Sequence, residues 1–491
     1  MNYRMLGYLF GMVATIEAAL LLIPAVVALI YGESVWPFLV TVALLLCLSV
    51  PALVFKPQNR RIFAKEGFVC ASGAWILLSV FGALPFVISG AIPNYIDALF
   101  ETVSGFTTTG ATILAQIEHL PKGILFWRSL THWVGGMGVL VFMLAVIPSS
   151  GGEAMYLLRA EVPGPTKGKL VPKMRRTAII LYAIYFALTV IETIALLCTG
   201  LPLYDSIVSA LGTAGTGGFA VKNASIAGYA NPAAEWVIAI FMFVFGVNFN
   251  MYYFLLIKRA REVRKNEELR VYVIITLLAT ALLALNTYHL FDGIGECIRA
   301  AFFQTTSIMS TTGYATVDYN TWNSFSKSLI VLLTMVGACA GSTAGGLKLS
   351  RVILMVKNIF REIKRVLRPN SVNAVRCDGE SVGADTLHGM SNYLTIYFTL
   401  IFLVTLIISI DGFDFETNIT AAITCINNVG PGFSLVGPAG NFSHFSQFSK
   451  IILSFAMLAG RLEILPLIIF FSPSAWKRSV KKSLRRKKAD I

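Results

Sequence analysis

The chain has 491 residues, of which 56% are hydrophobic and only 13% are charged, and its net charge is +14. Soluble domains carry about 25% charged residues, so the composition excludes an ordinary soluble protein. Many segments reach the ~20 apolar residues that a helix needs to cross a bilayer, and the even ladder of alternating strands of an outer-membrane barrel is absent. We therefore predict an all-α polytopic membrane protein.

Ten apolar spans are predicted in chain order. The first is long enough to cross a bilayer and lacks the cleavage pattern of a signal peptide, so we expect it to be retained. The spans lie at about 5–31, 35–55, 67–90, 123–147, 177–200, 233–257, 270–290, 325–347, 391–411 and 447–472.

Lys and Arg concentrate in alternate connections, namely 56–66, 158–176, 258–270, 348–376 and the tail from 477 to 488. The positive-inside rule places all five in the cytoplasm, with both termini on that side. The positive charge would also attract anionic lipid. Nucleic-acid binding is not predicted, because neither a binding domain nor interleaved aromatic residues accompany the basic tail.

The residues that usually carry catalysis are scattered. None of the seven cysteines forms a CxxC pair, and the five histidines show no metal-ligand spacing. No nucleotide-binding fingerprint is found. A disulfide framework, a zinc site, an organic cofactor and an enzymatic function are therefore not expected.

The remaining connections, at about 91–122, 201–232, 291–324 and 412–446, are long and half-apolar. Each has an acidic residue near its start, which would either attract cations or cap a short helix. Each also contains a polar string centred on a glycine. The strings are T-T-T-G-A-T at 107–112 (string 1), T-G-G-F-A at 216–220 (string 2), S-T-T-G-Y-A-T at 310–316 (string 3) and N-N-V-G-P-G-F at 427–433 (string 4).

These strings predict a carbonyl-lined ion site. A short helix that stops inside the membrane must return as non-helical backbone, which is tolerated only where it is buried or lines water. Repeated elements around one axis would present rings of carbonyl oxygens, the ligands of a dehydrated potassium ion, and glycine permits the necessary dihedrals. The predicted potassium-binding residues are Thr108, Thr109, Gly110, Thr216, Gly217, Gly218, Thr311, Thr312, Gly313, Asn428, Val429 and Gly430.

String 4 departs from the Thr-Gly pattern at Pro431, which leaves open whether Gly430 or Gly432 is the equivalent glycine. Asn427 and Asn428 are expected to brace the short helix rather than to supply oxygens.

A gate is predicted below the strings, where residues 337–347 place four glycines inside an apolar span. Such a run breaks a helix and borders a cavity, although a glycine-rich packing surface is the alternative. Arg461 in the last span would face an aqueous path or form a structural ion pair. The predicted gate residues are Gly341, Ser342, Thr343, Ala344, Gly345, Gly346 and Arg461.

Three further motifs carry a family resemblance: W-R-S-L-T-H-W-V-G-G-M-G at 127–138, C-A-G-S-T-A-G-G-L-K at 339–348 and A-G-R-L-E at 459–463. With the strings, they make the chain resemble the TrkH/KtrB-type bacterial potassium uptake proteins, closest to the TrkH branch with its two extra N-terminal helices. The resemblance implies four helix–pore-loop–helix repeats around a central pore. The glycine of the first string can be serine in plant relatives that pass sodium, so Gly110 implies a preference for potassium.

The resemblance also implies a homodimer in the bacterial inner membrane, with K⁺ as the transported ion and a TrkA/KtrA-like cytoplasmic nucleotide-binding protein as regulatory partner. The segments expected from the spans and the resemblance are 1–56 (two N-terminal helices), 57–157, 158–262, 263–375 and 376–474 (repeats 1 to 4), and 475–491 (basic tail).

Channel-like potassium uptake is the predicted function, and a secondary symporter coupled to protons or sodium is the alternative. A symporter would need ionisable residues at mid-membrane in facing repeats. Apart from Arg461 and Glu463, the best candidates are Glu17 and Glu192.

Overall fold

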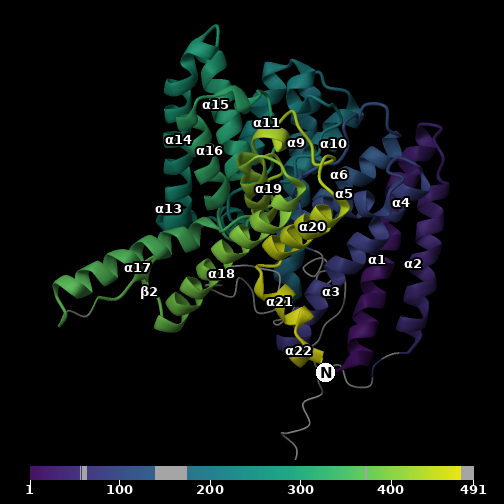
Figure 1. Cartoon of the computed structure of the whole chain (residues 1–491), viewed down its shortest axis with the longest axis horizontal. Helices are drawn as coiled ribbons and strands as arrows, with labels where there is room; N and C mark the ends of the chain where they lie inside the picture. The colour runs from purple at the N-terminus through teal and green to yellow at the C-terminus, as the bar shows by residue number, and fades with distance from the viewer. Residues whose placement is uncertain (56, 58–63, 139–173, 371–372, 477–491) are drawn as a thin grey trace, which may run out of the picture.

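The computed structural model describes residues 1–491 except 56, 58–63, 139–173, 371–372 and 477–491. In these residues the fold is almost entirely helical (Figure 1), with one antiparallel pair of two-residue strands, β1 (Arg376–Cys377) and β2 (Glu380–Ser381). The all-α prediction is confirmed. The basic tail and most of the basic segment 158–176 lie outside the described residues.

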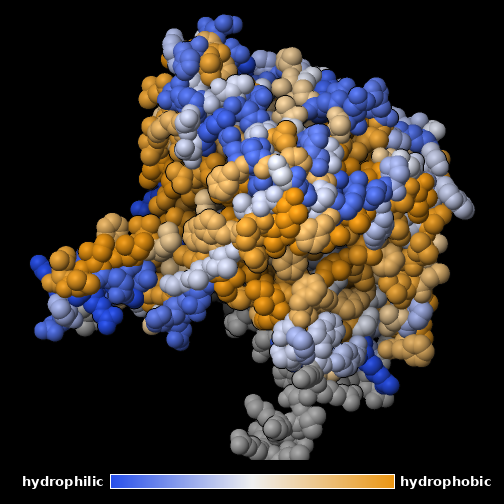
Figure 2. All heavy atoms as spheres, viewed as in Figure 1, coloured by the Kyte–Doolittle hydropathy of each residue, from blue (hydrophilic) through white to orange (hydrophobic). Residues whose placement is uncertain are grey.

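Six stretches of the described chain are helical, long and apolar enough to cross a membrane. They comprise α1 (Tyr3–Ile30), α2 (Trp36–Val54), α3 (Ala64–Gly82) with α4 (Leu84–Ile88), α9 (Met174–Cys198), α14 (Glu267–Thr287) and α18 (Ala384–Ile408). Figure 2 shows apolar residues along the flanks formed by α14 and α2. Large side chains such as Ile274 and Leu285 are exposed there, as expected of a surface that lipid covers.

Four other helices are too short to span, with 12 to 16 residues each. They are α5 (Tyr95–Phe106), α10 (Leu203–Gly215), α15 (Ile294–Met309) and α19 (Phe415–Asn427). Every one has a carboxylate in its first turn, where the positive end of the helix dipole favours it. Their last turns are completely buried, so the chain enters the protein interior and stops there.

Each short helix is followed by a helix that ends or breaks early in the described part of the chain. The first such helix, α6 (Lys122–Met137), ends at Gly138, and α11 (Pro232–Phe245) bends by 90° into α12 (Phe249–Leu256). The remaining breaks separate α16 (Ser324–Val336) from α17 (Leu349–Leu367), and α20 (Gln447–Arg461) from α21 (Leu465–Phe471), which α22 (Pro473–Trp476) follows.

The sequence predicted an interruption only within 325–347. In the structure, the spans predicted at 233–257 and 447–472 each consist of two helices with a break that the sequence did not indicate, and the end of 123–147 lies outside the described residues. Close approach of backbones explains two of these ends: a Cβ on Gly135 would overlap the Phe106 carbonyl oxygen, and one on Gly460 that of Ile426. Hydropathy does not register such a break, because the residues on both sides of it are apolar.

Helix contacts close into a circle. Each short helix packs against two interrupted helices, in the order α5, α6, α10, α11, α15, α16, α19, α20 and back to α5. Outside this circle, the helix pair α1 and α2 lies on one side, and α17 projects from the body on the other side (Figure 1). The last turns of the four short helices are thus brought to a common centre, while the assignment of four repeats and their boundaries stays a prediction.

Candidate functional site

All four short helices end in the same backbone motif. One residue of each string takes the left-handed conformation: Thr108 (φ 56°), Thr216 (φ 55°), Thr311 (φ 59°) and Asn428 (φ 54°). The next residue donates its N–H to the carbonyl five residues earlier over 2.8 to 3.0 Å, in the pairs Thr109–Ser104, Gly217–Gly212, Thr312–Ser307 and Val429–Thr424. This is the Schellman ending, with threonine or asparagine in the place that glycine usually takes.

A glycine with positive φ follows in every string, and these residues (the glycine ring) are Gly110, Gly218, Gly313 and Gly430. A Cβ added to Gly110 would overlap the carbonyl oxygen of Gly217. In the same way, a Cβ on Gly218 would overlap the carbonyl oxygen of Thr312, and a Cβ on Gly313 would overlap that of Val429. A Cβ on Gly430 would overlap the carbonyl oxygen of Thr109, which closes the circle. The strings therefore meet in a closed ring of backbone, in which no residue but glycine fits without displacing a carbonyl.

Gly430, rather than Gly432, takes the fourth place in the glycine ring. A Cβ on Gly432 would meet the side chain of Thr420 instead, and Gly432 has no positive φ. Pro431 does not break the pattern, because its ring lies next to Gly313.

Side-chain hydrogen bonds fix the strings from behind. The hydroxyls of Thr107 and Thr109 are 2.8 Å apart, and those of Ser310 and Thr312 are 2.7 Å apart. Asn427 bonds with the hydroxyl of Tyr397, in agreement with the bracing role expected from the sequence.

A cavity of about 140 Å³ adjoins all four ring glycines. Among the described residues that line it, none is acidic, and the charged ones are Arg128 and Lys222. Two of the acidic residues near the starts of these connections lie elsewhere: Asp97 pairs with Lys450 at 2.7 Å, and Asp414 caps α19. The C-terminal ends of the four short helices point their negative dipole ends toward the ring that their strings form.

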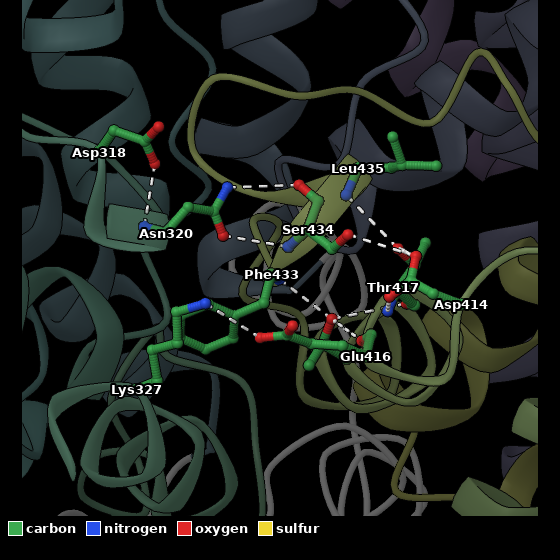
Figure 3. A network of polar contacts seen from close by, with 10 residues as sticks. Asp318, Asn320, Lys327, Asp414, Glu416, Thr417, Phe433, Ser434 and Leu435 are labelled. Carbon is green, nitrogen blue, oxygen red and sulfur yellow. Dashed lines mark hydrogen bonds and ion pairs between the residues drawn. The ribbon is translucent and has the colours of Figure 1, made fainter. Parts of the chain in front are cut away.

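Loops outside the ring join neighbouring strings. Figure 3 shows one such contact, in which Asn320 exchanges two hydrogen bonds with the backbone of Ser434 at 3.0 and 3.3 Å. Ser434 also donates to Asp414, and Lys327 pairs with Glu416 at 3.3 Å. The Thr417 hydroxyl and N–H donate to Asp414 and hold the pKa of its carboxyl below the usual value of 3.8.

Residues 337–348 form a non-helical loop between α16 and α17, as the sequence predicted, and the loop lies against strings 3 and 4. The N–H of Gly345 donates to the Thr311 hydroxyl over 2.7 Å, and a Cβ on Gly345 would meet the carbonyl of Asn427. Glu268 holds the loop from the other side, since its Oε1 accepts from the N–H groups of Ala340 (2.7 Å) and Ser350 (2.9 Å). Gly345, one of the predicted gate residues, therefore lies directly against strings 3 and 4.

Arg461 reaches from the end of α20 to this loop. Its guanidinium donates to the carbonyl of Thr343 over 2.9 Å, and to the carbonyls of Gly135 and Gly136 at the end of α6. The neighbouring carboxylate, Glu463, pairs with Arg351. Arg461 thus connects the loop to the broken ends of two helices.

Sequence reasoning missed the roles of three charged side chains: Glu101 and Arg128, which form a buried pair, and Glu268. A signal was available for the pair: an arginine inside the apolar span 123–147 needs a partner, and Glu101 lies in the preceding short helix.

Together these elements define a polytopic helical membrane protein whose four strings meet in one closed ring of backbone. Comparison with known proteins agrees. A model of the TrkH family, described as cation transport protein, matches residues 38–479. The chain belongs to this family, the predicted resemblance is confirmed, and the chain is a transport protein rather than an enzyme.

Among its relatives is the Trk system potassium uptake protein TrkH of Salmonella typhimurium, 34% identical over 97% of this chain and 100% of the relative. The Trk system potassium uptake protein TrkG of Escherichia coli is 32% identical over 97% and 99%. The crystal structure of the potassium transporter TrkH from Vibrio parahaemolyticus superposes with a TM-score of 0.87 at 28% identity, over 97% of this chain and 100% of that one.

Proposed function

We propose that the protein takes up potassium across the bacterial inner membrane, and that the glycine ring is its selectivity filter. The observation that carries this proposal is the closed sequence of contacts from Gly110 through Gly218 and Gly313 to Gly430, each against the carbonyl of the next string. The named relatives are potassium uptake proteins, which supports potassium as the ion.

Carbonyl oxygens suit a monovalent cation that must bind and leave again. They replace the hydration water of the ion without the strong attraction of a carboxylate. The lack of acidic residues among those lining the adjoining cavity fits this requirement, and the four helix C-termini add a diffuse negative potential. The predicted ligands are the carbonyls of residues 108–110, 216–218, 311–313 and 428–430.

The loop of residues 341–346, with Arg461, is the proposed gate. It lies against Thr311 and Asn427, so an ion leaving the ring toward the cytoplasm would meet it next. A loop without regular hydrogen bonds can change conformation at less cost than a helix. The positive charge of Arg461 at the same level would raise the barrier to a cation.

Proton- or sodium-coupled symport is the alternative, and one observation favours keeping it. Glu17 in α1 is fully buried, and neither carboxyl oxygen has a hydrogen-bond partner among the described residues. Such a carboxyl could carry a proton. Coupled transport would require a second ion gradient, whereas the membrane potential alone contributes about 2.3 kcal/mol per charge per 100 mV.

We further propose a homodimer and a TrkA/KtrA-like nucleotide-binding partner on the cytoplasmic side, with both termini on that side. The projecting helix α17 supports an assembly, because its apolar residues Ile359, Phe360, Ile363 and Val366 are exposed (Figure 2). Basic residues of α13 (Ala260–Lys265) are exposed as well and could meet an acidic partner surface. Mass measurement in detergent and co-purification from membranes test these two points.

Flux through the purified protein in liposomes tests the proposed function. Potassium, rubidium, sodium and lithium are compared, each driven by a membrane potential alone. Faster flux of potassium and rubidium than of sodium and lithium is expected. Equal flux of all four would reject a potassium filter, and flux that needs a proton or sodium gradient would favour the symporter.

A further inference from the structure

A buried ion pair lies directly beside strings 1 and 2. Glu101 of α5 and Arg128 of α6 are both buried, and Arg128 Nε lies 2.6 Å from Glu101 Oε1. Taking two charges out of water is costly unless further hydrogen bonds satisfy them. The remaining partners of this pair therefore indicate what it holds.

Glu101 holds string 1 and the residue that follows it. Its carboxylate accepts a hydrogen bond from the Thr112 hydroxyl over 2.9 Å and one from the N–H of Ile113 over 3.0 Å. Thr112 follows Gly110 by two positions. The carboxylate thus fixes the chain immediately after the first ring glycine.

Arg128 holds string 2. Its guanidinium donates to the carbonyl of Ala220 over 3.2 Å and lies 3.5 Å from the ring centre of Phe219. The ring of Phe219 also lies next to the ring of His132, with centroids 4.1 Å apart, and the same imidazole fills the space beside Gly217. The guanidinium and the imidazole together fix the chain on both sides of Gly218.

This device is specific to strings 1 and 2. The positions nine residues before the ring glycines hold Glu101, Ser209, Gln304 and Ala421, so the first alone carries a carboxylate. Strings 2 and 3 are joined by the hydroxyl of Tyr314, 3.2 Å from the carbonyls of Ser209 and Phe219. Strings 3 and 4 are joined by the neutral Asn320–Ser434 contact of Figure 3.

We propose that Glu101 and Arg128 are positioning residues that set the spacing between strings 1 and 2, and that this spacing contributes to the rejection of sodium. The proposal rests on the proposed function of the glycine ring. Ion selection by carbonyls depends on cavity size and on the number and field strength of the oxygens. All of these change when two neighbouring strings can move apart.

The test uses full-length protein in liposomes and the ratio of sodium to potassium flux. In the variant Glu101→Leu/Arg128→Met both charges are removed, because replacing both partners by apolar residues usually preserves folding, whereas removing one leaves an unpaired charge. The matched control is Glu235→Leu/Arg299→Met. It removes an ion pair of 2.7 Å between α11 and α15 that, among the described residues, has no hydrogen bond to a string residue.

We expect the sodium-to-potassium ratio of the Glu101/Arg128 variant to rise about tenfold, which corresponds to about 1.4 kcal/mol between the two ions. The control should keep the wild-type ratio. The double variant keeps the net charge of the protein, and any remaining electrostatic effect would act on both monovalent ions alike, so the ratio isolates the spacing. An unchanged ratio in a folded Glu101/Arg128 variant would overturn this inference alone, whereas a wild-type protein without ion preference would overturn the proposed function as well.

Discussion

The side-chain amide of Asn428 donates a hydrogen bond to the hydroxyl of Thr109 over 3.0 Å, and so joins the last string of the chain to the first. The same amide donates to the carbonyl of Met457 in α20 over 2.9 Å. Asn428 also holds the left-handed backbone position that threonine holds in the other three strings. Asn428 thus has two roles: its backbone takes the left-handed conformation, and its side chain joins string 4 to string 1.

Replacing Asn428 separates these two roles. Asn428→Gly keeps the left-handed backbone without strain and removes the amide, whereas Asn428→Val removes the amide and adds about 1–2 kcal/mol of left-handed strain. We expect the valine variant to unfold at a lower temperature in detergent than the glycine variant, and both to unfold below the wild type. Equal unfolding temperatures for valine and wild type would contradict the role of Asn428.

Arg461 is expected to restrict flux through the gate. Arg461→Ala removes both the charge and the contacts to Thr343, Gly135 and Gly136, so potassium flux in liposomes should rise about tenfold, equivalent to ~1.4 kcal/mol in the barrier. Arg461→Lys keeps the charge but loses the planar guanidinium, so its potassium flux should lie between those of the wild type and Arg461→Ala. Unchanged flux from normally expressed Arg461→Ala would reject a role in conduction.

Glu268 is expected to hold the loop in place, because one carboxylate oxygen accepts from the backbone on both sides of it, at Ala340 and Ser350. Glu268→Ala leaves both buried N–H groups without this acceptor, which costs about 1–3 kcal/mol each. Hydrogen exchange of residues 338–350 should then become faster. Glu268→Gln retains a carbonyl oxygen and serves as the control; if alanine exchanges no faster than glutamine, the loop is held by other contacts.

The lowered pKa of Asp414, which lies outside the membrane-spanning helices, predicts that the stability of the protein depends on pH. Its pKa is lower in the folded protein than in the unfolded chain, so its stabilising effect is present above the ordinary value of 3.8 and is lost as the pH falls through the lowered folded value. Asp414→Ala should cost about 1 kcal/mol as the loss of a helix cap. Thermal unfolding of wild type and variant should differ at neutral pH and converge in acid; a constant difference would contradict the assignment.

The strings could be found from sequence because a backbone constraint limits them to glycine and to residues that tolerate or brace a left-handed turn. The recurrence of Gly110, Gly218, Gly313 and Gly430 in otherwise apolar surroundings was therefore visible without coordinates. The choice between Gly430 and Gly432 was not, since it depends on which one meets the carbonyl of Thr109.

The helix breaks and the ion pair needed the structure. The breaks at 245–249 and 461–465 lie inside long apolar stretches, so hydropathy alone predicted continuous spans there. Glu101 and Arg128 lie 27 residues apart in different helices, and only the packing of α5 on α6 brings them together. The motifs in the sequence thus predicted the strings, whereas contacts between separate helices could not be predicted from the sequence.

Serine substitution in the glycine ring tests the central claim most directly. Gly110→Ser and Gly313→Ser each place a side chain on the carbonyl of the next string, while Gly295→Ser, where a Cβ meets nothing within 4 Å, is the control. The measurement is growth of a potassium-uptake-deficient strain at low potassium. We predict that the control restores growth as the wild type does and that both ring variants fail when expressed at the same level; full rescue by the ring variants would contradict a potassium filter at the glycine ring.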